Sequence, residues 1–306
     1  MQKISIIGAA GTLGASCAMN LALNSRISEL CLLDINEALL DNHIMDLENA
    51  FPDKYIYRGN YEDLAGSSIV VITAGVPNRN EETSRDAYLM ENVKIFKHIG
   101  ANIRKYCSNA IIITASNPVD LLNYYLHKEF GFKPHQLIGY TLNDSYRFSW
   151  AINKVLNGKN QVYSPVIGEH GETQVPIFSQ VRINNKEASF TVEEKKQIQE
   201  EIKTWFVKFN QLNIQRTTGW TTGVGISQLV GSLLSDQEVL TIGSVILRGE
   251  YNSQGISIGV PISVNREGVK QIIEWDLTVE ENKDFCSSVE KISKNIEESF
   301  LLKEEM

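Results

Sequence analysis

The chain is poor in cysteine and proline, and it has no long apolar run. Its four cysteines are Cys17, Cys31, Cys107 and Cys286, and no two of them form a C-x-x-C pair. This spacing excludes a zinc knuckle or a disulfide scaffold, so we predict buried or surface thiols and no metal site. The absence of an 18-residue apolar stretch excludes a membrane-spanning helix. No Pro/Gly-rich linker or internal repeat is present, so two domains should pack against each other rather than be tethered.

Positive charge is also scarce, since 29 Lys and Arg face 37 Asp and Glu for a formal net charge of -8. Phosphate neutralisation needs clustered basic residues, so we expect neither nucleic acid nor an anionic membrane as a partner. Residues 1–3 lead directly into the strand-like residues 4–7. This arrangement leaves no room for the charged region, apolar core and cleavage site of a signal peptide, so we expect a cytoplasmic protein.

Short apolar runs alternate with helix-period segments through the first 140 residues. The runs at 4–7, 30–33, 69–73 and 111–114 are typical of buried parallel strands. After about residue 145 the pattern changes to a helix over 145–156, a strand ending at Gly168, two helical stretches between 192 and 234, and strands at 242–247 and 256–264. The predicted fold class is α/β, with a Rossmann doubly wound parallel sheet over residues 1–142 followed by an α+β domain over residues 143–306.

A glycine-rich turn, Gly8-Ala9-Ala10-Gly11-Thr12-Leu13-Gly14, lies between the first strand and a helix-forming segment. Glycines let the backbone approach a pyrophosphate, and the helix N-terminus offers unpaired N–H groups to it. Asp34 ends the next strand, where a carboxylate would accept the adenosine ribose hydroxyls and repel a 2′-phosphate. These residues predict an NAD site. The open alternative is a turn that only packs strand against helix, with Asp34 capping a helix.

Further candidates for the NAD site follow later strands. In parallel sheets the ligand crevice lies beyond the carboxyl ends of the strands. The residues that occupy such ends are Thr73, Ala74, Gly75 and Asn117. We therefore add them to the predicted cofactor-binding set of Gly8, Gly11, Thr12, Leu13, Gly14 and Asp34.

Three side chains in the second half suggest acid–base chemistry. His170 lies between glycines, and an imidazole held by a carboxylate passes a proton near neutral pH. Asp144 and Arg147 are three residues apart, so on a helix they share a face. A guanidinium binds a carboxylate through two parallel hydrogen bonds. With a nicotinamide as hydride carrier, this set oxidises a 2-hydroxy acid; the alternative is an ion pair on a surface helix.

At these positions the chain resembles the L-lactate and L-malate dehydrogenase family along essentially its whole length. The ordered motifs are the glycine turn, Leu33-Asp34, Thr73-Ala74-Gly75-Val76-Pro77, Ser84-Arg85-Asp86, Ser116-Asn117-Pro118-Val119-Asp120, Asp144-Ser145-Tyr146-Arg147-Phe148 and Gly168-Glu169-His170-Gly171. The resemblance implies an NAD-dependent oxidoreductase that works as a homodimer or homotetramer.

The resemblance also implies roles for individual residues. His170 would exchange the proton with the substrate oxygen, and Asp144 would fix the histidine tautomer. Arg147 would bind the substrate carboxylate. Arg85, on a loop that closes, would polarise the reacting carbonyl. Asn117 would hydrogen-bond the substrate oxygen, before a proline that is often cis, and Thr221 and Thr222 would line the pocket.

The loop that chooses the substrate has an ambiguous register. Counting from Gly75 places Asn78 at the selecting position, whereas counting back from Arg85 places Arg79 there. An arginine would pair with the second carboxylate of malate, and a neutral residue suits lactate. The acidic residues of the loop favour lactate or another monocarboxylic 2-hydroxy acid, with L-malate as the alternative.

Two residues depart from the family pattern. Asn143 stands where leucine is usual, and Tyr146 occupies a usually small position, so the pocket has room to be atypical. Two remoter alternatives stay open. One is an NAD-dependent glycosidase, which would need a metal held by Cys and His. The other is a non-catalytic NAD-binding protein that keeps the scaffold.

Overall fold

The computed structural model describes residues 2–76, 89–212, 214 and 217–304. The predicted substrate-loop residues Asn78, Arg79 and Arg85 lie outside the described residues. All four cysteines are free thiols, three of them buried and Cys286 exposed. Within the described ranges, no helix has the length and apolar character needed to cross a membrane.

Six parallel strands form the N-terminal part of the sheet, in the order β3-β2-β1-β4-β5-β6. Their bounds are β1 Gln2–Ile7, β2 Ile27–Leu33, β3 Tyr55–Arg58, β4 Ile69–Ile72, β5 Ile111–Thr114 and β6 Leu137–Gly139. This order is that of doubly wound dinucleotide-binding sheets, so the predicted Rossmann fold is confirmed. The short strands β3 and β6 were not predicted from the apolar pattern.

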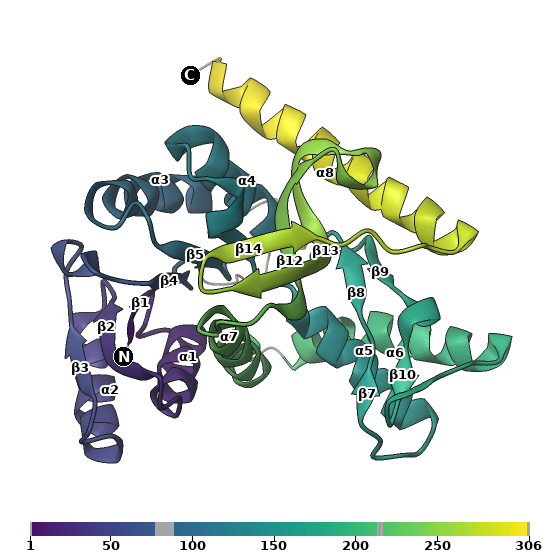
Figure 1. The fold of residues 1–306 in the computed structure, drawn as a ribbon, viewed down its shortest axis with the longest axis horizontal. Helices are drawn as coiled ribbons and strands as arrows, with labels where there is room; N and C mark the ends of the chain where they lie inside the picture. Colours follow the sequence, from purple (N-terminus) through teal and green to yellow (C-terminus); the bar gives the residue numbers. More distant parts are fainter. Residues whose placement is uncertain (1, 77–88, 213, 215–216, 305–306) are drawn as a thin grey trace.

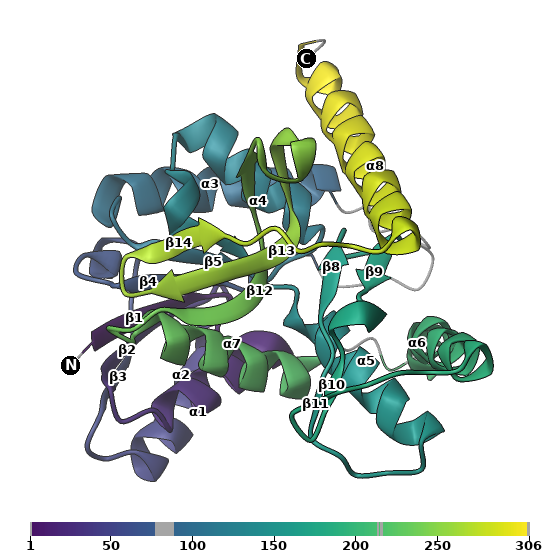
Figure 2. The ribbon, with the colours of Figure 1, turned by 45° about the vertical axis from the view of Figure 1, so that its right-hand side comes forward.

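Helices cover both faces of these strands (Figures 1 and 2). Their bounds are α1 Thr12–Ala22, α2 Glu37–Ala50, α3 Leu89–Tyr106 and α4 Val119–Phe130. An apolar face that packs on the sheet stabilises such a helix. In α3 this face contains Phe96, Ile99 and Ile103, which are buried and follow each other at helical spacing. Helices α3 and α4 lie on one side of the sheet, and α1 lies on the other side next to α7.

The sheet continues into the second half of the chain. An antiparallel hairpin of β12 and β13 pairs with β6, so eleven strands of the described part of the chain form one sheet. Its further strands are β8 Val166–Gly168, β9 Gln174–Pro176, β12 Val239–Arg248, β13 Gln254–Asn265 and β14 Gly268–Ile272. Strands β7 Val162–Tyr163, β10 Arg182–Ile183 and β11 Lys186–Glu187 form a separate small sheet. The two halves of the chain therefore pack against each other, as expected, and the pairing of β12 with β6 joins them by backbone hydrogen bonds.

Four helices and four 3-10 turns complete the described elements. The helices are α5 Leu142–Val155, α6 Val192–Gln211, α7 Gly219–Leu233 and α8 Val279–Glu304. The 3-10 turns are η1 Glu62–Leu64, η3 Pro134–Gln136, η4 Phe178–Gln180 and η5 Glu250–Asn252. Helix α5 begins three residues earlier than predicted, so Asp144 lies in its first turn.

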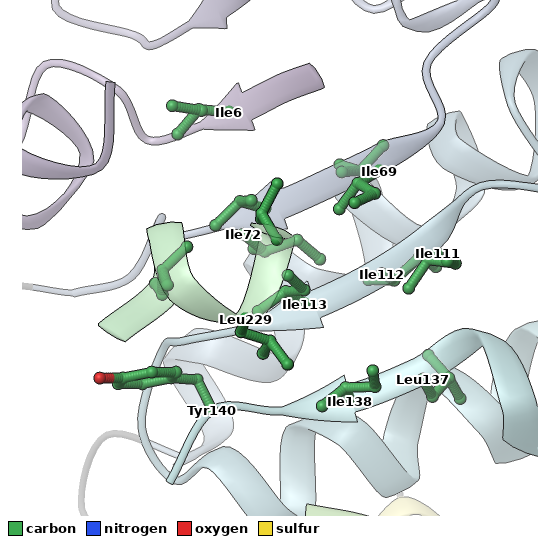
Figure 3. Close-up of a cluster of buried hydrophobic side chains, with 14 of the residues drawn as sticks. Ile6, Ile69, Ile72, Ile111, Ile112, Ile113, Leu137, Ile138, Tyr140 and Leu229 are labelled. Atoms are coloured by element: carbon green, nitrogen blue, oxygen red, sulfur yellow. The ribbon is translucent and has the colours of Figure 1, made fainter. Parts of the chain in front are cut away.

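The main core fills the space between the sheet and its helices. Figure 3 shows Ile72, Ile113 and Ile138 on neighbouring strands, with Leu229 of α7 beside them. All four are at most 1% exposed, and burying each such side chain contributes roughly 1.5–3 kcal/mol. A smaller second core joins α5 to α6; it contains Phe148 and Ile152 of α5 and Ile198 and Ile202 of α6.

Helices α1 and α7 approach each other closely through glycine. A Cβ atom built on Gly223 of α7 would overlap Ser16 of α1. On Gly219, a Cβ atom would lie 2.8 Å from the side chain of Thr12. Because Thr12 is the first residue of α1, this contact holds α7 against the glycine turn.

We expect Gly223→Ala to lower the free energy of unfolding by about 1–3 kcal/mol, because the added methyl overpacks the contact with Ser16. The matched control is Gly231→Ala on the same helix, where the nearest atom to a new Cβ is 3.6 Å away. This control should gain about 0.5–1 kcal/mol, since alanine favours a helix over glycine. Thermal unfolding followed by circular dichroism measures both, and equal effects of the two changes would contradict the proposed contact.

Candidate active site

The glycine turn between β1 and α1 has the shape that a pyrophosphate requires. Gly8 has a φ of +93°, and a Cβ atom on it would overlap Ala74. A Cβ atom on Gly14 would overlap the carbonyl oxygen of Gly8. Gly11 is exposed, with its nearest neighbour 3.6 Å from the Cβ position. The outer glycines therefore close the turn, and the middle one leaves the backbone open to a ligand.

The helix that follows begins at Thr12 without a side-chain cap, since its N-cap is Gly11. The N–H groups of its first turn are thus free to bind an anion. Asp34 lies after β2 and is half-buried. Its Oδ2 accepts a hydrogen bond from the Ala10 N–H at 2.9 Å, which joins the carboxylate to the glycine turn. These residues fit the diphosphate and the adenosine ribose of NAD.

The later strand ends are connected by hydrogen bonds. Thr73 Oγ1 donates to the Gly8 carbonyl at 3.0 Å, so the end of β4 meets the glycine turn. Asn92 of α3 accepts from Val76 N–H and donates to the carbonyl of Asn117, both at 2.8 Å. The Asn117–Pro118 peptide bond is cis, as expected. Asn92 was missed from the sequence, because an asparagine inside a helix carries no signal of what it contacts.

The predicted acid–base residues lie in contact. Nδ1 of His170 lies 2.6 Å from Oδ2 of Asp144, and the other oxygen of Asp144 accepts a hydrogen bond from Arg147 Nη1 at 2.9 Å. The three side chains are 9%, 3% and 12% exposed, respectively. This burial is unlike the surface ion pair considered as the alternative. One carboxylate thus holds both the imidazole and the guanidinium.

Two further contacts support the loop that carries His170. The carboxylate of Asp120, in the first turn of α4, accepts from the His170 backbone N–H at 2.8 Å. Ser288 of α8 accepts from the Glu169 N–H at 2.6 Å and donates to the Thr173 carbonyl at 2.9 Å. Asp120 ends one of the family motifs but was given no role from the sequence, and Ser288 was not singled out, because both lie far from position 170 along the chain.

Asn143 belongs to a buried polar network beside Asp144. Its amide oxygen accepts from Tyr140 Oη at 3.0 Å. Its amide nitrogen donates to Thr222 Oγ1 at 2.7 Å and to Thr218 Oγ1 at 3.3 Å. Thr222 is therefore buried against the start of α5, whereas Thr221 is exposed on α7. Of the two predicted pocket threonines, the structure brings only Thr222 next to the acid–base residues.

The other unusual position, Tyr146, lies against α7. Its hydroxyl donates to Gln228, and its ring fits where Gly225 has no side chain. In the part of the chain that the structure describes, no three His, Cys, Asp or Glu side chains gather in a group able to hold a metal ion.

The arrangement defines a class of protein. Residues suited to NAD lie at the carboxyl ends of parallel strands, and the same sheet continues towards a histidine, an aspartate and an arginine that contact one another and are little exposed. A nicotinamide carries hydride, and these side chains handle a proton and a carboxylate. The chain is accordingly an NAD-dependent oxidoreductase acting on CH–OH groups.

Comparisons with known proteins place it within that class. The model of the lactate/malate dehydrogenase NAD-binding domain matches residues 2–139, and that of the α/β C-terminal domain matches residues 141–302. A malate dehydrogenase of Halobacterium salinarum is 33% identical, covering 97% of this chain and 99% of its own. L-lactate dehydrogenase 1 of Bacillus cereus is also 33% identical, covering 97% and 98%.

Solved structures agree with these sequence relatives. The malate dehydrogenase of Cryptosporidium parvum superposes with a TM-score of 0.89 at 28% identity, covering 97% of this chain and 98% of its own. The lactate dehydrogenase of Eimeria maxima, solved with NADH and oxamate, gives 0.90 at 27% identity, covering 98% and 94%. The chain belongs to the lactate/malate dehydrogenase family.

We expect the affinity for NADH to exceed that for NADPH by at least about 100-fold, because the charge of Asp34 repels a 2′-phosphate at the edge of the glycine turn. Asp34→Asn keeps an acceptor for the Ala10 N–H but removes the charge, so it should narrow this ratio about tenfold. Titration of nucleotide fluorescence measures both affinities. Glu48→Gln, which removes an exposed carboxylate of α2, should leave the ratio unchanged; an unchanged ratio in Asp34→Asn would contradict the role of Asp34.

Burial raises the pKa of Asp120 to about 6 from 3.8, although the hydrogen bond from the His170 N–H lowers it in part. The folded protein therefore binds this proton more tightly than the unfolded chain. The contribution of Asp120 to stability is thus largest at low pH and falls as pH rises towards 6 and above.

The test compares the wild type with Asp120→Asn, which does not titrate. The free energy of unfolding of the wild type should fall by about 1 kcal/mol relative to the variant between pH 5 and pH 7.5. Urea unfolding followed by tryptophan fluorescence measures it. A difference between the two proteins that stays constant over this range would show that Asp120 titrates normally.

Proposed function

We propose that the chain catalyses the reversible oxidation of an L-2-hydroxy acid to a 2-oxo acid, with a monocarboxylic acid of the lactate type preferred. The observation that carries the proposal is the Asp144 carboxylate, which contacts His170 and Arg147 with its two oxygens. This shared contact supports a site in which His170, as proton donor, and Arg147, as receptor of the substrate carboxylate, are held at a fixed distance from each other. Bound NAD supplies the hydride acceptor for the oxidation.

His170 is the acid–base group of this proposal. Nδ1 faces Asp144, so we assign to Nε2 the exchange of a proton with the substrate oxygen. Oxidation takes the hydroxyl proton onto Nε2, and reduction returns it. Asp144 keeps the ring in one tautomer and stabilises the imidazolium that forms. The backbone contact to Asp120 fixes the position of the ring as it changes charge.

Arg147 is the carboxylate receptor. It retains N–H donors beyond the one given to Asp144, and a planar guanidinium pairs with a carboxylate through two parallel bonds. Asn117 is exposed in the loop that follows β5, and we assign its amide to a hydrogen bond with the substrate oxygen and to a contact with the nicotinamide. Thr222 lies beside Asn143, close to the same site.

The remaining assignments are also proposals. The cofactor set comprises Gly8, Gly11, Thr12, Leu13, Gly14, Asp34, Thr73, Ala74, Gly75 and Asn117. Arg85 polarises the carbonyl, Asn78 or Arg79 selects the substrate, and Thr221 lines the pocket beside Thr222. Residues 1–142 serve as the NAD-binding domain and residues 143–306 as the catalytic domain. We expect a cytoplasmic homodimer or homotetramer.

L-Malate is the second candidate substrate. It is favoured by Arg79 and by the malate dehydrogenase relatives from Halobacterium salinarum and Cryptosporidium parvum. A cation paired with the second carboxylate in a closed site shifts selectivity by several kcal/mol. The loop register therefore decides between the two acids. Glu81 and Glu82 carry negative charge on the same loop, which disfavours a dicarboxylate.

The test measures NADH oxidation with pyruvate, oxaloacetate and a branched 2-oxo acid in parallel and compares kcat/KM. We expect pyruvate or the branched acid to exceed oxaloacetate, because Asn78 then occupies the selecting position. Preference for oxaloacetate would place Arg79 there and make malate the substrate. His170→Asn is the control and should lower kcat by about 100-fold to 10,000-fold with the best acid. Absence of turnover by the wild type on every acid would overturn the proposal itself.

A further inference from the structure

The guanidinium of Arg147 has an aromatic neighbour that the proposed reaction does not use. Its Cζ lies 4.5 Å from the centre of the Trp205 ring, in the geometry of a cation over an aromatic face. Trp205 lies on α6, and Arg147 lies on α5, one turn after Asp144. The guanidinium thus donates a hydrogen bond to Asp144 through one of its nitrogens and lies over the ring of Trp205.

The packing of α6 explains why Trp205 reaches this place. Ile198 and Ile202 of α6 are buried against Phe148 of α5 in the smaller core. Trp205 follows Ile202 by three residues, so it continues the same helix face towards the start of α5. Its other neighbour is Phe209, whose ring is stacked at 5.1 Å with an interplanar angle of 14°. Figure 2 shows the two helices at the same side of the molecule.

The stack limits how the guanidinium can move. An arginine has several rotatable bonds, and a single contact with Asp144 would leave its plane free to turn. An indole ring whose centre lies 4.5 Å from Cζ restricts that rotation by contact. Within the described ranges, Asp144 is the one hydrogen-bond acceptor of Arg147, so donors remain in the plane for an incoming carboxylate.

We propose that Trp205 is a positioning residue of the substrate site, which orients the Arg147 guanidinium for two-bond capture of the substrate carboxylate. The inference rests on the proposed role of Arg147 and extends it to a second helix. Since the interaction is present before and during the reaction, its loss affects binding of substrate and transition state equally. The expected signature is a raised KM with little change in kcat.

The experiment measures steady-state kinetics with the preferred 2-oxo acid, and calorimetric binding of oxamate to the enzyme–NADH complex. Trp205→Leu should raise both KM and the oxamate Kd about tenfold, with kcat changed less than about twofold and NADH affinity unchanged. Trp205→Phe keeps a ring that attracts a cation less strongly, so its effect should fall between the wild type and the leucine variant. An unchanged KM and oxamate Kd in Trp205→Leu would overturn the proposal.

The matched control is Trp150→Leu. Trp150 lies on α5 one turn after Arg147, is exposed, and has Lys154 5.0 Å from its ring centre. Loss of this surface pair should leave KM, kcat and oxamate binding as in the wild type. If Trp205→Leu instead lowers kcat, NADH affinity and the unfolding temperature together, Trp205 is only a packing residue and the proposal is wrong.

A double-mutant cycle separates this inference from the proposed function. In an Arg147→Gln background, Trp205→Leu should have no further effect on oxamate binding, because Trp205 acts through the guanidinium. An equal loss in both backgrounds would show that Trp205 acts independently and would overturn the inference. If Arg147→Gln itself binds oxamate normally, the proposed carboxylate receptor is wrong instead.

Discussion

The shared carboxylate of Asp144 is the interaction on which the site depends. A buried carboxylate is costly to leave without partners, and here each oxygen has one, His170 and Arg147. Its position in the first turn of α5 adds the favourable field of a helix N-terminus. The same carboxylate therefore sets both the orientation of the imidazole and the position of the guanidinium. The distance between the imidazole and the guanidinium follows from these two contacts.

The fold delivers this arrangement by ending several elements at one place. Strand β6 leads into α5, β8 ends just before His170, and α4 supplies Asp120 beneath the same loop. Helix α7 links the two functional regions. It meets the glycine turn through Gly219 and the start of α5 through the hydrogen bond from Asn143 to Thr222. A displacement of α7 would thus disturb nucleotide and substrate sites together.

One relative named for malate and one named for lactate are each 33% identical to this chain, and a further malate dehydrogenase is 34% identical. The family therefore includes enzymes named for both substrates, and the roles proposed for Asp144, Arg147 and His170 concern the part that the two acids share. The difference between the acids is a second carboxylate, and it is recognised by residues outside that set. Trp205, if it orients Arg147, acts on the shared part and so should matter for either acid.

The sequence by itself determined the parallel sheet, the glycine turn, the place of Asp34 after the second strand, the shared helix face of Asp144 and Arg147, and the family. These features depend on local spacing, because apolar runs, glycines at a turn and residues one helical turn apart have the same meaning wherever they occur. Only the tertiary structure decided that the sheet continues through β12, that Asn92 and Asp120 brace the site, and that Trp205 lies over Arg147. The contacts of Asn92 and Asp120 join residues 25 and 50 positions apart, and that of Trp205 joins two different helices. A side chain that pairs across the fold leaves no periodic signal in its own segment.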